Sequence, residues 1–189
     1  MTTPTRTINN VELPAAGTWT IDPGHAQVGF VGRHFGLTKV RGRFTDVSGD
    51  IVITDNIEDS TVTVDIVVAS INSGDQTRDD HLRSEDLFNV AEHPSARFVS
   101  TALATGGATA TLTGDLTIKG VTKSVTLDVE YLGYAKDPWE NDRAIFSAAG
   151  IVNREDWDLT WNMVLETGGL LVSKEIRLEI EVELILEKT

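Results

Sequence analysis

The sequence predicts an all-β protein: an eight-stranded antiparallel β-barrel with an internal apolar cavity and one short helical segment. Two observations predict this fold class. Apolar and polar residues alternate over at least four long segments, and short connections join nearly all of them. Such a pattern is typical of antiparallel sandwiches and barrels. A third observation, the length of the last segment, favours the barrel.

The clearest strand is predicted over residues 174–186. Even positions from Ile176 to Leu186 are apolar, and odd positions from Glu175 to Glu183 are charged. A period of two places these two sets on opposite faces of a strand. Thirteen residues extend about 43 Å at roughly 3.3 Å each. With strands tilted by about 40° this length gives a barrel roughly 30 Å deep, and closure removes the exposed edges that long strands would leave.

The same alternation recurs along the chain. It predicts strands within 60–70, 109–118 and 123–134, and further strands fit 26–35, 39–44, 47–53, 97–105 and 143–153. The stretch from Ile118 to Val121 is typical of a tight hairpin turn between two of these strands. Residues 1–17 are polar, carry Pro4 and Pro14, and are predicted to form a flexible tail. The barrel domain is predicted to span 18–189.

Small residues lie among the positions expected to face the barrel interior. Ala26, Gly32, Gly42, Gly114 and Gly150 leave space there, or the glycines let bent strands turn corners. Together they favour an internal apolar cavity suited to a hydrocarbon. The residues expected to line it are Val28, Phe30, Phe44, Phe98, Leu112, Leu116, Val125, Phe146, Leu178 and Ile180.

The stretch TRDDHLRSEDLFN, residues 77–89, breaks the alternation and predicts one or two short helical turns, with a capping box from Thr77 to Asp80. Arg78, His81 and Arg83 lie close together in it. They are candidates to bind a phosphate or carboxylate at the barrel mouth, with Asp79 orienting one of them. The alternative is an intramolecular salt-bridge cluster with the neighbouring acids.

Composition and charge narrow the function. The net charge is −13, from 16 basic and 29 acidic residues, which predicts repulsion of nucleic acid and of anionic lipid headgroups. The absence of cysteine excludes disulfides, thiolate metal sites and cysteine nucleophiles. The four histidines lack metal-ligand spacing, and neither G-x-S-x-G nor a glycine-rich phosphate loop occurs. We therefore expect no catalytic residue, no metal and no cofactor.

No apolar run approaches the roughly 20 residues that span a bilayer. The first residues also lack the apolar core of a signal peptide. These features predict a cytoplasmic protein without membrane insertion, and a homodimer is compatible with them.

Several segments together resemble the YceI-like family. Residues 19–44, WTIDPGHAQVGFVGRHFGLTKVRGRF, are similar to its opening pattern of W-x-I-D-x-x-H, F-x-x-x-H and V-x-G-x-F. Residues 71–101, INSGDQTRDDHLRSEDLFNVAEHPSARFVST, are similar to its middle signature, R-D-x-H-L-R-S followed by an F-x-S strand. Residues 112–133 resemble its G-x-L-T-I-x-G-V-T hairpin. Residues 146–162 and the last strand complete a resemblance over about residues 18–187.

The resemblance implies an extended, lipocalin-like barrel that binds polyisoprenoid chains in its interior, and it places Arg78, Asp79, His81 and Arg83 at matching signature positions. We therefore expect binding of a long isoprenoid lipid, a polyprenyl phosphate or an isoprenoid quinone, for carriage or storage. Two alternatives stay open. One is an enzyme with His81 and Asp79 as acid and base on a lipid headgroup, and the other is a filled barrel acting only as an interaction module.

Overall fold

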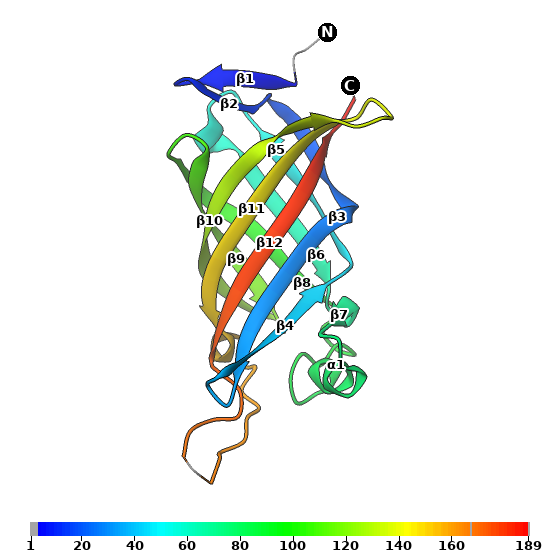
Figure 1. Ribbon diagram of the computed structural model, residues 1–189, viewed down its shortest axis with the longest axis vertical. Coiled ribbons are helices and arrows are strands. Elements are labelled where there is room, and N and C mark those ends of the chain that lie inside the picture. The colour runs from blue at the N-terminus through cyan, green and yellow to red at the C-terminus, as the bar shows by residue number, and fades with distance from the viewer. Residues whose placement is uncertain (1–3, 167, 189) are drawn as a thin grey trace.

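The computed structural model describes residues 4–166 and 168–188, which form a closed antiparallel barrel (Figure 1). Eight strand positions close the wall, and the predicted fold class is confirmed. In spatial order the wall consists of β3 (Gly17–His34), β4 (Thr38–Phe44) with β5 (Val47–Ile53), β6 (Thr61–Val67), β8 (Ser95–Thr105), β9 (Thr109–Ile118), β10 (Val121–Lys136), β11 (Asp142–Asn153) and β12 (Glu175–Leu186).

The last strand closes the barrel because β12 pairs with β11 on one edge and with β3 on the other. The register sets Leu178 opposite Phe30 and Ile180 opposite Val28, so the inward apolar residues of the two strands lie side by side. The twelve residues of β12 extend about 40 Å at roughly 3.3 Å each. The expected long, tilted strands are visible in Figure 1.

Strands β4 and β5 serve as one interrupted strand. The first residues of β3, 17–20, pair with β5, and its last residues, 28–34, pair with β4. Ser70 holds the interruption, because its Oγ accepts hydrogen bonds from the backbone N–H groups of Thr45 and Asp46, both at 3.1 Å. Beyond it β6 pairs with β5, whereas the other edge of β4 pairs with the short β7 (Ile71–Asn72).

The predicted turn between β9 and β10 is confirmed. Lys119 and Gly120 both have positive φ, 50° and 73°, as a two-residue type I′ hairpin requires. The turn fixes a register in which Ile118 opposes Val121 and Leu112 opposes Leu127.

The segment predicted as a flexible tail contains a hairpin. Strands β1 (Thr5–Ile8) and β2 (Val11–Pro14) pair with each other and lie across one end of the barrel (Figure 1). Leu13 and Pro14 are buried, and the Arg6 guanidinium donates to the carbonyls of Thr54 and Asp55. Polar composition misled the prediction, because a short hairpin needs only a few apolar contacts to dock. Residues 1–3 of that predicted tail, and Thr167 and Thr189 of the predicted domain, lie outside the described residues.

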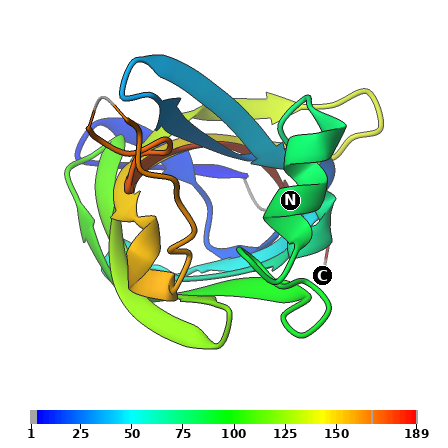
Figure 2. The same ribbon diagram turned by 90° about the horizontal axis from the view of Figure 1, so that it is seen from below.

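The other end of the barrel carries the helix α1 (Gln76–Arg83), seen from below in Figure 2. The helix was predicted, but its cap was not: Asp75 is the N-cap and accepts from the Arg78 N–H at 2.8 Å. The described residues also form three short 3₁₀ helices: η1 (Ile57–Asp59), η2 (Val68–Ser70) and η3 (Arg154–Trp157). We call the β1–β2 end the upper end and the α1 end the lower end, as in Figure 1.

The core is the inner surface of the wall, in two clusters. One is centred on Trp19, whose indole Nε1 donates to the Ala15 carbonyl at 3.1 Å. The other includes Trp157, whose Nε1 donates to the Leu116 carbonyl at 2.9 Å. Both indoles are fully buried. Among the described residues, no helix is long and apolar enough to span a bilayer.

Candidate binding site inside the barrel

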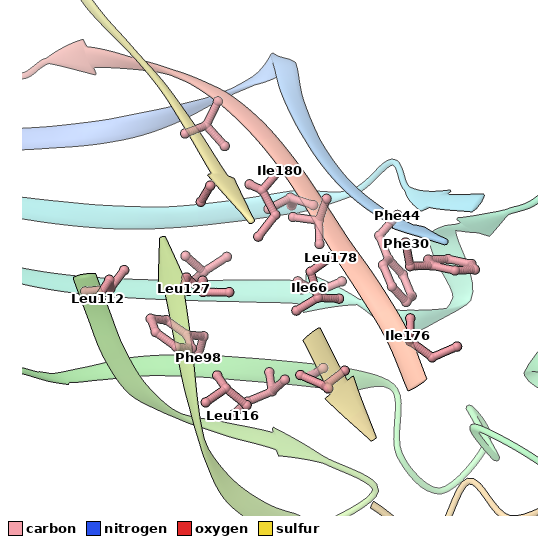
Figure 3. Close-up of a pocket in the computed structure, with 18 of the residues that line it drawn as sticks. Phe30, Phe44, Ile66, Phe98, Leu112, Leu116, Leu127, Ile176, Leu178 and Ile180 are labelled. Carbon is pink, nitrogen blue, oxygen red and sulfur yellow. The ribbon is translucent and has the colours of Figure 1, made fainter. Parts of the chain in front are cut away.

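The barrel encloses a cavity of about 850 Å³, which we call the lumen. Binding pockets for small molecules usually measure about 300–1,000 Å³, so the lumen lies in the upper part of that range. Apolar side chains from every strand of the wall point into it, as Figure 3 shows for ten labelled residues. A cavity of this size contradicts the filled-barrel alternative.

All ten apolar residues expected to line the cavity do so. They are Val28, Phe30, Phe44, Phe98, Leu112, Leu116, Val125, Phe146, Leu178 and Ile180. The prediction omitted others of the same parity. Ile176, Val182 and Leu184 also line the lumen and could have been read from the alternation of β12.

The inward glycines leave space indirectly. A Cβ on Gly42 would overlap the ring of Phe30, its cross-strand partner, and a Cβ on Gly114 would overlap the ring of Phe98. Each ring therefore lies over a glycine, close against the wall. The glycines keep large aromatic rings off the barrel axis, which leaves the centre open.

At the upper end Leu13 and Pro14 of the terminal hairpin contribute to the lining. Tyr131 lines this cavity too and packs on Phe146, with ring centroids 5.2 Å apart. Its hydroxyl is buried and has no hydrogen-bond partner among the described residues, and burial raises the pKa of the phenol. This orphaned hydroxyl is a polar group that a ligand could satisfy.

At the lower end α1 and the loop before it present polar groups to the lumen, among them Ser73, Arg78 and His81. Arg78 donates through Nε to Ser73 Oγ at 2.7 Å and through Nη2 to the Ser73 carbonyl at 2.9 Å. Buried Asp79 accepts from the N–H and hydroxyl of Ser73, at 2.8 and 2.5 Å. Asp79 thus orients Arg78 through Ser73.

The four polar residues predicted as one group are divided by the structure. Arg78 and His81 line the lumen, whereas Asp79 and Arg83 are not among the lining residues. Arg83 donates to the carbonyls of Ala69 and Ile71, at 2.9 and 2.7 Å, and forms an ion pair with Asp80 at 3.2 Å. Its donors hold α1 to the chain segment before it, and Arg83 does not line the lumen.

His81 pairs with Asp86, Nε2 to Oδ2 at 3.2 Å, and its ring meets Trp161 edge-on with centroids 4.4 Å apart. The enzyme alternative had paired His81 with Asp79, but Asp79 is bonded to Ser73 instead. The acid and base expected for headgroup chemistry are therefore not in contact. The predicted salt-bridge cluster is present only in part, as the pairs Arg83–Asp80 and His81–Asp86.

Sequence reasoning missed Arg154. This residue lines the lumen from η3, on the opposite side of the lower end from α1 (Figure 2), and only 7% of it is exposed. The alternation of β11 offered a signal, because Phe146, Ala148 and Val152 face inward and position 154 has the same parity. The pattern predicts an inward-facing apolar residue at position 154. The cation found there could therefore have been identified from the sequence as a candidate site residue.

A second polar cluster lies on the barrel wall. Arg143 donates to Asp22 Oδ2 at 2.6 Å, to Asp137 Oδ2 at 2.9 Å and to Glu183 Oε2 at 2.9 Å. Asp22, His25 and Glu183 offer ligand atoms within 4.8 Å of one another, which is metal-like spacing. The guanidinium already supplies the positive charge between Asp22 and Glu183, so the cluster is an ion-pair network.

Burial alone would raise the pKa of Asp22, but hydrogen bonds from Arg143 and His25 outweigh it, so the pKa is lowered. Burial likewise opposes the charge of Asp137, and bonds from Asn141 and Arg143 hold the pKa of that carboxyl well below its usual range. Both acids are therefore ionised at neutral pH, which keeps the three-carboxylate clamp on Arg143 intact.

The similarity of this chain to known proteins extends over the residues that form the barrel. The sequence matches the YceI-like domain over residues 19–184. A UPF0312 protein of Photorhabdus laumondii is 38% identical over 182 residues, covering 95% of this chain and 92% of the relative. A UPF0312 protein of Staphylococcus aureus is 34% identical over 169 residues, covering 87% of this chain and 95% of the relative.

Solved structures share the same architecture. The YceI protein of Campylobacter jejuni is 31% identical, with a TM-score of 0.71 over 82% of this chain and 90% of that one. A polyisoprenoid binding domain from Saccharophagus degradans shares the fold at 16% identity, with a TM-score of 0.66 over 92% of this chain and all of that one. The extended match in sequence and the shared barrel establish the relationship, and the chain belongs to the YceI-like domain family.

Proposed function

We propose that this protein binds one long isoprenoid lipid inside the barrel, a polyprenyl phosphate or an isoprenoid quinone, and carries or stores it. The lumen is the observation that carries the proposal: a cavity of about 850 Å³ with an apolar lining along the barrel. The fold neighbour from Saccharophagus degradans, described as a polyisoprenoid binding domain, supports the same ligand class.

The physical chemistry of the lining favours a hydrocarbon. Burying apolar surface gives about 0.8 kcal/mol per methylene-sized group, so a chain of several isoprene units gains enough to offset the several kcal/mol lost on association. Branched methyl groups suit a wall of Val, Ile, Leu and Phe. The lining offers few polar groups, so the apolar chain supplies most of the affinity.

The polar end of the lipid lies at the lower end in this proposal. Arg78 and His81 line the lumen there, and Asp79 positions Arg78 through Ser73. Arg83 has a supporting role, because its donors fix the segment that carries α1. In this proposal Arg78 and His81 face the ligand, whereas Asp79 and Arg83 hold the segment that carries them in place.

Two neighbouring alanines on β11 provide a matched test. Ala148 lines the lumen, whereas Ala149 has the opposite parity. Ala148→Phe places a ring where the lipid chain would lie, and each methylene-sized group that it displaces should weaken lipid binding by about 0.8 kcal/mol. Ala149→Phe should bind lipid as the wild type does. Native mass spectrometry and solvent extraction of the purified proteins measure the retained lipid.

Circular dichroism shows whether both variants keep the barrel. Equal lipid retention by the two variants would count against a site in the lumen. A wild-type protein that is empty after purification, and that takes up no added polyprenyl lipid, would refute the proposed function itself.

A further inference from the structure

The guanidinium of Arg154 is a buried charged group in the lumen for which the site described above gives no role. Its Nε donates to the Ser173 carbonyl at 3.0 Å and its Nη1 to the Leu159 carbonyl at 2.6 Å. Its Nη2 is buried and has no hydrogen-bond partner among the described residues. Arg154 also forms no ion pair with any described carboxylate, since its neighbour Glu155 pairs with Lys174 at 2.8 Å.

The two carbonyl partners satisfy donors but leave the guanidinium without a carboxylate in contact, since Glu155 attracts it without forming an ion pair. A buried cation without an opposite charge costs several kcal/mol, and an unmade hydrogen bond adds to that cost. Burial lowers the pKa of Arg154, yet a guanidinium stays protonated at neutral pH. If Arg154 served only to hold η3 to residues 159–173 through these two hydrogen bonds, a neutral donor would be enough. The positive charge of the side chain therefore indicates an anionic partner in the lumen.

We propose that Arg154 is the headgroup subsite of the lumen, where Nη2 donates to an anionic oxygen at the end of the bound lipid. This inference rests on the proposed function and narrows it. The ligand is an isoprenoid with a phosphate or carboxylate end, and a neutral quinone leaves the charge of Arg154 uncompensated. The head lies against η3 and the apolar chain extends toward the upper end. Arg78 and His81 face the same end of the lumen from α1.

Ligand pairs that share a chain and differ only in the head test this assignment. Comparing geranylgeranyl phosphate with geranylgeraniol measures the contribution of a phosphate head. Comparing retinoic acid with retinol measures the contribution of a carboxylate head. Affinities are measured by calorimetry on the delipidated, full-length protein. Arg154→Met should weaken the phosphate or the acid by about 10- to 100-fold, the range for a charged hydrogen bond, and the alcohols by less than about threefold.

Arg97→Met is the matched control, because Arg97 lies on the outer face of β8 in an ion pair with Asp65. It should leave all four affinities unchanged. Arg154→Lys keeps the charge but loses the forked donors, and should bind the anionic ligand with intermediate affinity. If Arg154→Met does not fold, the affinities of Arg154→Lys for the anionic ligands and the alcohols still test the assignment.

A response in one pair identifies the head as phosphate or carboxylate. Equal weakening of anions and alcohols by either variant, or no weakening of any ligand, overturns the headgroup assignment and leaves Arg154 a structural clamp. A wild-type protein that binds none of the four ligands overturns the proposed function instead.

A second inference comes from the outer surface of the lower end. The β3–β4 turn exposes Phe35 and Leu37, the latter at 79%, and the loop beside it exposes Met163 and Val164, the latter at 80%. The two loops are joined, because the Phe35 N–H donates to the Leu171 carbonyl at 2.9 Å. Figure 1 shows both projecting from the lower end.

The β3–β4 part of this region carries a charge opposite to that of the whole chain. No acidic residue occurs between Asp22 and Asp46, whereas Arg33, Lys39, Arg41 and Arg43 lie in that interval. Arg41 pairs with Glu179 at 2.8 Å, whereas neither Arg33 nor Lys39 forms an ion pair within the described part of the chain. Adjacent residues of the same loops, including His34 and Leu171, line the lumen, so the patch is continuous with the cavity.

We infer that this lower-end patch docks on an anionic bilayer, with the exposed apolar side chains among the headgroups and the cations of β3 and β4 against lipid phosphates. The net charge of −13 predicts repulsion from such a surface. On β3 and β4 the absence of acids between Asp22 and Asp46 reduces that repulsion, and Glu166 is the one acid between Asn162 and Leu171 in the neighbouring loop.

Flotation with phosphatidylcholine vesicles, with and without about 30% phosphatidylglycerol, tests this docking. The wild type should float with the anionic vesicles at low salt and lose most binding at high salt. The double variant Leu37→Ser and Val164→Ser should stay unbound. Trp139→Ser, which removes an indole 76% exposed on the β10–β11 connection, should bind as the wild type does.

Failure of the wild type to float, or equal loss in the Trp139→Ser control, would overturn membrane docking. Analytical ultracentrifugation covers the remaining outcome. If the wild type dimerises and the double variant does not, the patch is an interface between two copies, and the bilayer assignment is wrong.

Discussion

Single residues set the width of the lumen. Gly42 and Gly114 accommodate the rings of Phe30 and Phe98, which lie against the wall because no Cβ displaces them. The sequence had suggested that small residues leave space by being small. The structure shows that they leave space by where they let their aromatic neighbours lie.

Gly42→Ala tests this effect. The added methyl overlaps the Phe30 ring, which must turn toward the barrel axis. We expect unfolding free energy to fall by about 1–3 kcal/mol and lipid capacity to fall with it. Gly32→Ala is the control, since its Cβ would lie 3.3 Å from the flexible end of Ile176 and should cost less than half as much. Denaturant titration and native mass spectrometry measure both, and equal effects would refute the ring-displacement argument.

The ion-pair network around Arg143 gives the barrel a defined acid dependence. The pKa values of Asp22 and Asp137 are lower in the folded protein than in the unfolded chain. A carboxyl with a lowered pKa stabilises the fold above its unfolded value of about 3.9 and loses that contribution as the pH falls through its folded value.

Arg143→Met should therefore reduce stability at neutral pH, because three carboxylates then face one another without a cation. The difference from the wild type should shrink as the pH falls below about 4, where protonation removes the repulsion. Thermal melts across this pH range measure the difference. A deficit that is constant with pH would mean that Arg143 acts by packing alone.

At the level of elements, the ends of the barrel differ. The upper end is covered by the β1–β2 hairpin, which packs Leu13 and Pro14 over the lumen and is held by Arg6. The lower end is built from α1, η3 and the loops around them, and it holds most of the polar groups. A lid of two four-residue strands is a weak element, because a hairpin of this size has little stability of its own.

Removing residues 1–14 should leave the barrel folded, since β3 begins at Gly17 and the Trp19 bond to Ala15 is retained. We expect a loss of about 2 kcal/mol, the value for one buried leucine, and faster release of bound lipid. Stopped-flow transfer of a fluorescent isoprenoid measures the release rate. Arg6→Ala should give an intermediate rate, and an unchanged rate in the truncated protein would show that lipid does not pass the hairpin.

For the molecule as a whole, the lumen means that the empty barrel is underpacked. Side chains around a void lack contacts that a ligand restores. The stability of the protein should therefore depend on its ligand more than that of a filled barrel of the same length.

Delipidated protein should regain about 4 kcal/mol when a tight ligand is added at about 1,000 times its Kd. Calorimetric melts with and without geranylgeranyl phosphate measure the gain. Ala148→Phe fills part of the lumen and should gain much less. An equal gain in both proteins would mean that the lipid binds outside the barrel.

The sequence by itself determined the barrel and ten of the apolar residues that line it. Alternation with a period of two assigns each residue of a strand to one face, so the ten apolar positions followed from parity alone. The same signal was available for Arg154, because position 154 directly follows β11 and continues the inward parity of that strand. The hairpin turn at Lys119 and Gly120 was equally local, because its backbone angles depend on those residues.

The tertiary structure decided what parity cannot reach. Arg78, Asp79, His81 and Arg83 are within six positions of one another, yet two face the lumen and two hold the local chain. That division depends on Ser73, Ala69 and Ile71, which precede the helix. Docking of the terminal hairpin, and the meeting of η3 with α1 around one cavity, likewise arise only when β12 closes the wall against β3. Strand periodicity records which face a residue occupies, whereas partners distant in sequence determine what each side chain meets there.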